Sequence, residues 1–316
     1  MAKGRVINLN GGNYQILLDD GTIISAKASG RLRYQKVSSD SEFNKNTNKL
    51  SKKLSTTRIK ISPKVGDFVL YEENEDNNYI TEVLPRANSL IRPDIANVDQ
   101  IILVFAAKEP QFSFYLLDMF LVNILKQNIT PVIIISKADL LSDDEYVSLN
   151  LKMDYYRHLG WQALFVNSLN LKERNKILNI LKGKVSVLSG QTGAGKSTLI
   201  NGIIPGFSLN TNEISKALGR GKHTTREVTL YSYKKILLGD TPGFSKFDLQ
   251  FFDINEDELA HLFPEFDEYV CKFNDCAHLK NTPGCGVYEA YVNGKILDTR
   301  YLSYLKMREE IIKNRG

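Results

Sequence analysis

The sequence feature that most constrains the fold is a glycine-rich segment that begins at Gly190. An apolar run at residues 185–188 leads into it, and helix-forming residues follow it. Two glycines, a lysine and a serine within the segment have the GxxxxGK(S/T) spacing, in the strand, loop and helix context of a P-loop. Such a loop turns backbone N–H groups toward a polyphosphate at the positive end of a helix. We therefore predict that Lys196 reaches the β- and γ-phosphates of a nucleoside triphosphate and that Ser197 binds Mg²⁺.

Two later segments complete the motif order of a GTPase. An apolar strand ends in the DxxG motif formed by Asp240 and Gly243. The Asp240 carboxylate suits an outer-shell Mg²⁺ contact, and the Gly243 amide suits the γ-phosphate. A glycine-rich, cationic loop at residues 219–226 lies between the two motifs and resembles a switch segment. Its hydroxyls, on Thr224 and Thr225, are alternative Mg²⁺ ligands.

A guanine-reading (N/T/S)KxD element should follow the DxxG motif, but the nearest match, at 245–248, lies too close to it to reach a base. A better match lies upstream, where a β-branched strand at 131–135 ends in Ser-Lys-Ala-Asp at 136–139. Another strand, beginning at 163, ends near Ser168, where a backbone amide could meet guanine O6. The base-reading motifs thus precede the phosphate-reading motifs. Circular permutation explains this order, because the ligand of a doubly wound sheet lies across the strand ends whatever their order in the chain.

This arrangement resembles the RsgA (YjeQ/YloQ) family of circularly permuted GTPases over nearly the whole chain. The segments that carry the resemblance are 86–93, 96–99, the permuted motifs, 219–225 and a cysteine and histidine cluster at 271–285. The resemblance implies an N-terminal OB-fold and a role late in assembly of the small (30S) ribosomal subunit, with 16S rRNA as the RNA bound. It also implies that His223 replaces the water-orienting glutamine of Ras-like enzymes, because a hydrophobic residue, Phe244, follows the DxxG motif. The alternative is that His223 only contacts RNA or solvent.

The candidate nucleotide site draws on all of these motifs. The residues expected to bind GTP are Ser136, Lys137, Ala138, Asp139, Ser168, Gly190, Gln191, Thr192, Gly193, Ala194, Gly195, Lys196, Ser197, Thr198, Asp240 and Gly243. Those expected to bind Mg²⁺ are Ser197, Thr225 and Asp240, and those expected to act in hydrolysis are His223, Lys196 and Thr225. Ser136 replaces the usual asparagine, so we expect a weaker tie between the loops and modest affinity, while Asp139 still selects GTP over ATP. The loss of one amide contact costs about 0.5 to 1.5 kcal/mol.

Every cysteine of the protein falls within a short late segment. Cys271, Cys276, His278 and Cys285 form a complete Cys₃His set, which predicts a structural Zn²⁺ without an open position for a catalytic water. The resemblance implies five residues between the histidine and the last cysteine, whereas this chain has six. We expect the Pro283-Gly284 turn to absorb the extra residue. Clustering of all three cysteines favours a metal in a reducing cytoplasm over a disulfide framework.

Residues 1 to about 84 are predicted to form a small barrel. Short strands are expected at 5–9, 14–18, 22–26, 68–71 and 79–83, with glycine-containing turns between them. Residues 27–64 carry eleven lysines and arginines against two acidic residues, a net charge of +9. Their middle part, 38–57, is polar and predicted to be disordered when free. This segment suits binding to an RNA phosphate backbone, with a salt dependence to match.

Composition limits the remaining classes. The 316 residues have a formal net charge of +5, which permits an anionic partner. No apolar segment approaches the roughly 20 residues of a membrane span. The N-terminal residues lack the apolar region of a secretory signal, so we expect a cytoplasmic protein. We also expect no membrane or DNA partner and a monomeric state.

The fold class predicted is multidomain. An all-β OB-fold barrel (1–84) precedes a central α/β, circularly permuted P-loop GTPase domain (85–250) and a mostly helical zinc-binding domain (251–316). The α/β assignment rests on strands near 101–105, 131–135, 163–166 and 185–188 that alternate with helices at 114–126, 143–159 and 171–181. Further helices are expected at 256–263 and 301–313.

Two other functions are compatible with a P-loop. An ATPase or small-molecule kinase would use the same loop, but the Ser-Lys-Ala-Asp motif argues against it, and nucleotide competition separates the two. An RNA-binding protein that holds its nucleotide only as a structural ligand is compatible with Phe244. Turnover stimulated by a ribosomal particle would exclude that alternative.

Overall fold

The structure, a computed structural model, describes residues 1–30, 32, 35–38, 56–59, 61–74, 77–90, 93–167, 171–204, 228–240 and 254–315. The chain divides into two compact units. Unit 1 comprises Met1–Asp99, Leu181–Val187 and Arg220–Pro242, and unit 2 comprises Gln100–Ile180, Leu188–Gly219 and Gly243–Gly316. Among the described helices, none is both long enough and apolar enough to cross a bilayer.

Unit 1 contains a closed five-stranded barrel. Its strands are β1 (Ala2–Asn10), β2 (Asn13–Leu17), β3 (Ile23–Ala28), β6 (Phe68–Glu73) and β7 (Asn78–Val83). The order is β1-β2-β3-β7-β6, and β1 closes the barrel by pairing with both β2 and β6. The pairs are antiparallel except β3 with β7, which is parallel. This topology confirms the predicted OB-fold, a shape that commonly binds nucleic acid.

Alternation of side chains along the barrel strands creates its core. Val6, Ile16, Val69 and Ile80 are fully buried, and Tyr71 lies beside them. Residues at every second position face inward in a strand, which explains why these apolar positions alternate with polar ones. β4 (Gln35–Ser38) and β5 (Thr56–Ile59), which were not predicted, pair antiparallel in a separate two-stranded sheet. Most of the basic segment predicted to bind RNA, including 39–55, lies outside the described residues.

Three more strands belong to unit 1. β12 (Thr229–Tyr233) and β13 (Ile236–Asp240) form an antiparallel hairpin. The first half of β11 (Val185–Gly190) pairs with β13 in parallel. β12 pairs with β1 of the barrel at a single position, Asn8 with Thr229, and the side chains of those residues share a hydrogen bond of 2.7 Å.

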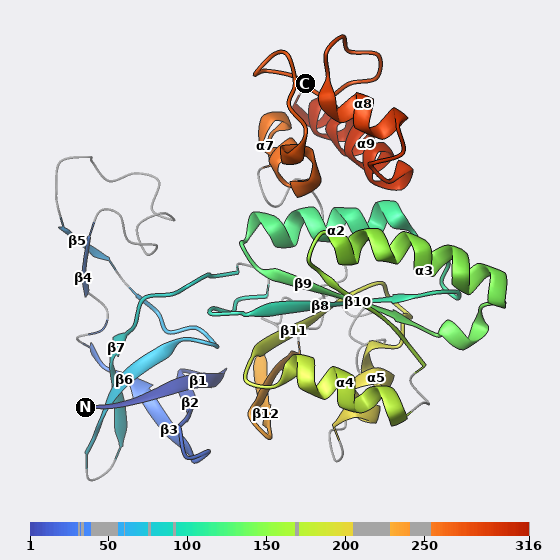
Figure 1. Cartoon of the computed structure of the whole chain (residues 1–316). Coiled ribbons are helices and arrows are strands. Elements are labelled where there is room, and N and C mark those ends of the chain that lie inside the picture. Colours follow the sequence, from blue (N-terminus) through green and yellow to red (C-terminus); the bar gives the residue numbers. More distant parts are fainter. Residues whose placement is uncertain are drawn as a thin grey trace. The chain divides into compact units, whose positions relative to one another are not determined.

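The sheet of unit 2 contains three parallel strands in the order β10-β9-β8. These are β8 (Gln100–Ala106), β9 (Thr130–Ser136) and β10 (Gln162–Val166). Helices α2 (Phe114–Lys126) and α3 (Asp143–His158) cover one face, and α4 (Leu171–Leu181) and α5 (Lys196–Ile203) lie on the other (Figure 1). Helices on both faces explain why β8 and β9 are almost continuously apolar. Serine hydroxyls cap two of these helices, Ser113 at α2 and Ser142, in a capping box with Glu145, at α3.

The C-terminal part of unit 2 is mostly helical. It contains α7 (Glu256–His261), the 3₁₀ helix η5 (Pro264–Glu268), α8 (Gly286–Val292) and α9 (Asp298–Arg315). Its core consists of Phe263, Phe266, Tyr304 and Met307 and extends to Val122 of α2. A helical C-terminal segment was predicted, and the helix expected at 301–313 is longer at both ends.

Candidate functional site

The P-loop has the backbone geometry that its glycines predict. Gly190 ends β11 with a φ of 118°, and a Cβ there would lie 2.2 Å from the carbonyl oxygen of Val104. Gly193 and Gly195 both have a φ of 81°, which glycine adopts without strain. Gly195 caps the N-terminus of α5 without a side chain, so no side-chain acceptor occupies the N–H groups of the first turn. This arrangement is what a bound phosphate requires.

The Lys196 side chain is hydrogen-bonded to the backbone of the P-loop. Its ammonium group donates to the carbonyl oxygens of Gly190 at 2.8 Å and Gln191 at 2.7 Å. Burial lowers the pKa of Lys196 to about 8. A negatively charged phosphate near the ammonium group would favour its protonated form and offset this loss of hydration.

The base-reading segment follows β9. Ser136 is the last residue of the strand, Lys137 adopts a left-handed conformation with a φ of 54°, and Asp139 lies in the short 3₁₀ helix Ala138–Leu140. Asp139 is exposed, so its carboxylate is accessible to a base. Ser136 is 2% exposed and pairs in the sheet with Ala106 and Val166, which places the carboxyl ends of β8, β9 and β10 at one edge.

A direct contact joins the base-reading segment to the P-loop. The Ser136 hydroxyl lies 2.6 Å from the carbonyl oxygen of Ala194 and 3.1 Å from that of Phe105. Its single proton can serve one of these bonds at a time, and the shorter distance favours Ala194. We expected the serine to join the two loops less strongly than an asparagine would. In the structure, one hydrogen bond joins them. The permuted motifs therefore meet in space although 58 positions separate Ser136 from Ala194.

A third loop, which was not predicted from the sequence, supports both segments. The side-chain amide of Gln191 donates to the carbonyl of Gln111 at 3.2 Å, and Lys137 donates to the carbonyl of Glu109. A Cβ on Gly193 would lie 3.6 Å from Pro110. The only signal in the sequence was a proline soon after the apolar strand at 101–105. The loop between β8 and α2 therefore helps to position the P-loop.

Several predicted site residues lie outside the described part of the chain. They are Ser168, His223, Thr224, Thr225, Gly243 and Phe244. Asp240 ends β13, where its backbone pairs with Thr229, but its side chain is not described. Their roles remain predictions.

The four predicted zinc ligands come together. Cys271, Cys276, His278 and Cys285 place one ligand atom each within 4.8 Å of one another. The sulfur atoms of Cys271 and Cys285 are 3.9 Å apart, and Nδ1 of His278 lies 3.5 and 3.7 Å from them. Tetrahedral Zn²⁺ with bonds of about 2.3 Å to sulfur and 2.0 Å to nitrogen requires separations of roughly 3.5 to 3.8 Å. The donor set of all four residues and the spacing of Cys271, His278 and Cys285 are thus compatible with a structural zinc ion.

Burial changes the pKa values of two of the predicted ligands. Burial lowers the pKa of His278, which favours the neutral imidazole that binds metals. Burial raises the pKa of the Cys285 thiol to about 12, a cost that a cation would offset. Tyr301 and Tyr304 donate to the carbonyls of His278 and Ala277 at 2.8 and 2.9 Å. The C-terminal helix α9 therefore packs on the loop that carries the cluster.

A buried charge cluster anchors the C-terminal helices to α2. The Arg300 guanidinium is fully buried and pairs with Asp118 at 2.8 Å and Glu265 at 2.7 Å. Tyr156 of α3 donates to the same Asp118 carboxylate at 2.9 Å. Burial raises the pKa of Asp118, whereas the Arg300 charge acts in the opposite direction. The sequence did not predict this role for Arg300, because the segment that forms α9 is polar in composition.

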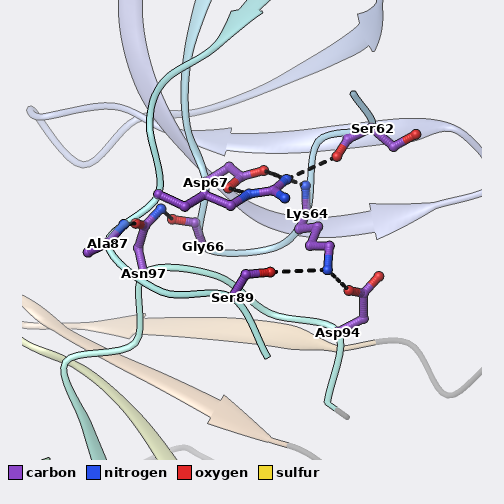
Figure 2. Close-up of polar contacts among 9 residues, drawn as sticks. Ser62, Lys64, Gly66, Asp67, Ala87, Ser89, Asp94 and Asn97 are labelled. Carbon is purple, nitrogen blue, oxygen red and sulfur yellow. Dashed lines mark hydrogen bonds and ion pairs between the residues drawn. The ribbon is translucent and has the colours of Figure 1, made fainter. Parts of the chain in front are cut away.

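The segments at 86–93 and 96–99 form a polar network in unit 1 (Figure 2). Arg86 donates twice to the fully buried Asp67, with both bonds at 2.7 Å. Asn97 accepts from the amide of Ala87 at 2.8 Å and donates to the carbonyl of Gly66 at 3.1 Å. A Cβ on Gly66 would lie 1.9 Å from the carbonyl oxygen of Ala96. These hydrogen bonds therefore fix the backbone of the described part of the two segments, where the chain leaves the barrel after β7.

A closed OB barrel, a P-loop joined to an upstream Ser-Lys-Ala-Asp segment and a Cys₃His cluster together define a circularly permuted P-loop GTPase whose C-terminal part carries a cluster compatible with zinc. A model of the RsgA GTPase family matches residues 83–250. The chain belongs to the RsgA GTPase family.

Proteins of the same length support this assignment. Small ribosomal subunit biogenesis GTPase RsgA of Leuconostoc citreum is 42% identical over 99% of this chain and 96% of its own length. RsgA 2 of Oceanobacillus iheyensis is 42% identical over 98% of each chain. The crystal structure of YloQ, a circularly permuted GTPase, superposes with a TM-score of 0.78 at 33% identity and covers 100% of this chain and 96% of its own. YjeQ from Thermotoga maritima gives a TM-score of 0.77 at 31% identity over 98% of each chain.

Proposed function

We propose that this chain hydrolyses GTP and acts late in the assembly of the small (30S) ribosomal subunit. The observation that carries the nucleotide part is the hydrogen bond from Ser136 to Ala194, because it brings a guanine-type motif beside the P-loop. The relatives named small ribosomal subunit biogenesis GTPase support the partner. Binding of 16S rRNA would follow from that partner.

Guanine selection would rest on Asp139. Its carboxylate can accept hydrogen bonds from guanine N1–H and the exocyclic amine, whereas adenine offers no matching pair of donors. Ser168 would contribute a backbone amide to guanine O6. Competition between GTP and ATP for the purified protein tests this selection, and equal affinity for the two would refute it.

Hydrolysis would use groups that meet at the γ-phosphate. Lys196 neutralises charge on the β- and γ-phosphates, and the Gly243 amide contacts the γ-phosphate. Mg²⁺ held by Ser197, Thr225 and Asp240 would neutralise further charge on these phosphates when bound. His223 would orient or deprotonate the attacking water, since Phe244 stands where Ras-like enzymes have a glutamine.

The role of His223 has a direct test. Replacement of His223 by alanine should slow hydrolysis while GTP affinity stays unchanged. Turnover equal to that of the unmodified protein would exclude His223 as the catalytic group.

The remaining parts would serve docking on RNA. The barrel and the basic segment 27–64 would bind the rRNA backbone, and the zinc ion would stabilise the C-terminal helices. The proposed domains are 1–84, 85–250 and 251–316, in a monomeric, cytoplasmic protein. GTP would order the switch near Thr225 and Gly243, and hydrolysis would release it.

The deciding experiment measures GTP and ATP hydrolysis by the protein alone, with isolated small subunits and with isolated large subunits. Lys196→Ala serves as the blank, since it removes the phosphate-binding ammonium group. A rise in GTP turnover with the small subunit alone supports the proposal. Equal use of ATP, or no stimulation by any particle, contradicts it.

A further inference from the structure

A second cationic site lies in unit 1, among residues that the P-loop does not use. An open pocket of about 280 Å³ is lined by residues of barrel strands β1, β2 and β6, the turn before β11 and the β12–β13 hairpin. Four basic side chains line it, from Lys3, Arg5, Lys184 and Lys235. Asp19 is the one acidic residue among its lining residues.

An aromatic ring holds two of these cations at the wall of the pocket. The Lys3 ammonium lies 4.6 Å from the centre of the Phe68 ring, and the Arg5 guanidinium lies 4.0 Å from it. Contacts of this kind fix the direction of a cation without neutralising its charge. Arg5 is partly buried; burial lowers its pKa and the nearby Asp99 carboxylate raises it, and an arginine stays protonated at neutral pH. Asp19 and Asp99 are thus two acidic groups against four basic ones. The pocket therefore carries an excess of positive charge that a bound anion would offset.

The four cations come from two groups of elements, the barrel on one side and the β11–β13 region on the other. We call the contact between these two groups the joint. Lys3 and Arg5 belong to β1 of the barrel, whereas Lys184 and Lys235 lie next to β11 and β13. Across this joint, β1 pairs with β12 at only one position. An anion in the pocket would contact both sides and strengthen the joint. Strand β13 begins at Ile236, directly after Lys235, and its Leu237 lines the pocket, so a ligand here would touch the strand that ends at Asp240 of the DxxG motif.

We propose that this pocket binds a phosphate group and clamps the barrel to the β12–β13 hairpin. Lysine and arginine N–H groups suit phosphate oxygens, and Arg5 can bind two oxygens at once. The phosphate can come from the backbone of an RNA or from a free phosphorylated small molecule, since both present the same oxygens. The site is separate from the P-loop and does not require GTP hydrolysis.

The hairpin turn offers a matched pair of variants. Lys235 lines the pocket, whereas its neighbour Lys234 does not and has its ammonium 5.4 Å from the Tyr233 ring. Both lysines are exposed and both have positive φ, 65° and 43°. Lys235→Glu and Lys234→Glu therefore change the net charge equally at neighbouring positions. Lys184→Glu, with Lys182→Glu as its control, provides a second pair.

The test uses the full-length protein saturated with GDP and Mg²⁺, so that the P-loop is occupied. Inorganic phosphate and a short single-stranded RNA are titrated separately, and the backbone amides of Gly4 and Gly183 are followed by NMR. We expect Lys235→Glu to weaken binding by about fivefold or more and Lys234→Glu by less than about twofold. Thermal unfolding shows whether both variants remain folded. Lys235→Gln replaces Lys235→Glu if that variant unfolds at a lower temperature than the unmodified protein.

Each outcome decides the proposal. Selective loss of inorganic phosphate binding in Lys235→Glu supports a free phosphorylated ligand. Selective loss of RNA binding alone supports a backbone phosphate. Equal losses of ligand binding in Lys235→Glu and Lys234→Glu would show that only the net charge matters. An absence of NMR shifts at Gly4 and Gly183 would show that no ligand binds at this pocket. Either result overturns the proposal.

Discussion

The hydroxyl of Ser136 donates a hydrogen bond across 2.6 Å to the carbonyl oxygen of Ala194, within the P-loop. Both residues are buried, at 2% and 0% exposure. The bond links the predicted base-reading segment to the P-loop, and we expect it to couple the two halves of the proposed nucleotide site without the longer asparagine side chain.

Removal of this hydroxyl should weaken nucleotide binding. In Ser136→Ala the loops lose their direct tie, and the Ala194 carbonyl loses a partner. A buried hydrogen bond contributes about 1 kcal/mol, so GDP affinity should fall about fivefold. Fluorescence titration with labelled GDP measures the change. Ser142→Ala is the control because that hydroxyl caps α3 away from the P-loop, and equal affinities in both variants would contradict the coupling.

Nucleotide binding should take up a proton on Lys196. Burial lowers the pKa of this lysine from 10.5 to about 8 in the nucleotide-free protein. Between these values the unfolded chain holds a proton that the folded chain lacks, so this group makes stability rise with pH. Bound phosphates raise the pKa again, so GDP binding at a pH near 8 should take up as much as about half a proton.

Calorimetry in two buffers of different ionisation enthalpy measures this proton uptake. Lys196→Met removes the titrating group, and its weaker GDP binding can be followed at higher protein concentration. The same uptake in Lys196→Met as in the unmodified protein would assign the proton to another group.

Two ion pairs in Figure 2 should differ in their contribution to stability. Arg86 and Asp67 have side chains that are 9% and 0% exposed, whereas Lys64 and Asp94 are 21% and 65% exposed. Arg86→Met leaves the Asp67 charge buried and should cost about 3 to 5 kcal/mol. Lys64→Met should cost less than about 1 kcal/mol because water already hydrates Asp94. Urea unfolding measures both, and equal losses would show that burial does not set the difference.

Periodic patterns predicted the fold well, and side-chain contacts were harder to predict. Apolar alternation gave the barrel strands, and the spacing from Gly190 to Ser197 gave the P-loop. The partners of Arg300 could not be predicted, since Asp118 lies 182 positions away and only the packing of α9 on α2 joins them. The loop at Glu109–Gln111 was missed for a similar reason: its contacts with the P-loop use backbone carbonyls, which any sequence supplies.

The geometry at Cys285 leads to a prediction for the zinc cluster. The Cys285 sulfur accepts from the amide of Tyr288 at 3.3 Å at the start of α8, and Cys271, Cys276 and His278 surround it. With the ion removed, three thiols and an imidazole lose the bonds that hold the loop against Tyr301, so residues 271–285 should become sensitive to protease. A structural zinc site contributes folding energy directly. Chelation should therefore lower the unfolding temperature of the C-terminal part, while GDP binding persists because Lys196 and its loop do not contact the cluster residues.

Zinc content and limited proteolysis test this prediction with a matched pair of variants. Cys276→Ser removes one ligand and should reduce the content well below the expected value of about one zinc per chain. His261→Ala, in which the lost side chain is 77% exposed and is not a ligand, should keep the full content and the protease resistance. Cleavage within 271–285 should then appear in Cys276→Ser and in the chelated protein at the same sites. Full zinc content together with unchanged protease resistance in Cys276→Ser would contradict the assignment of Cys276 as a ligand.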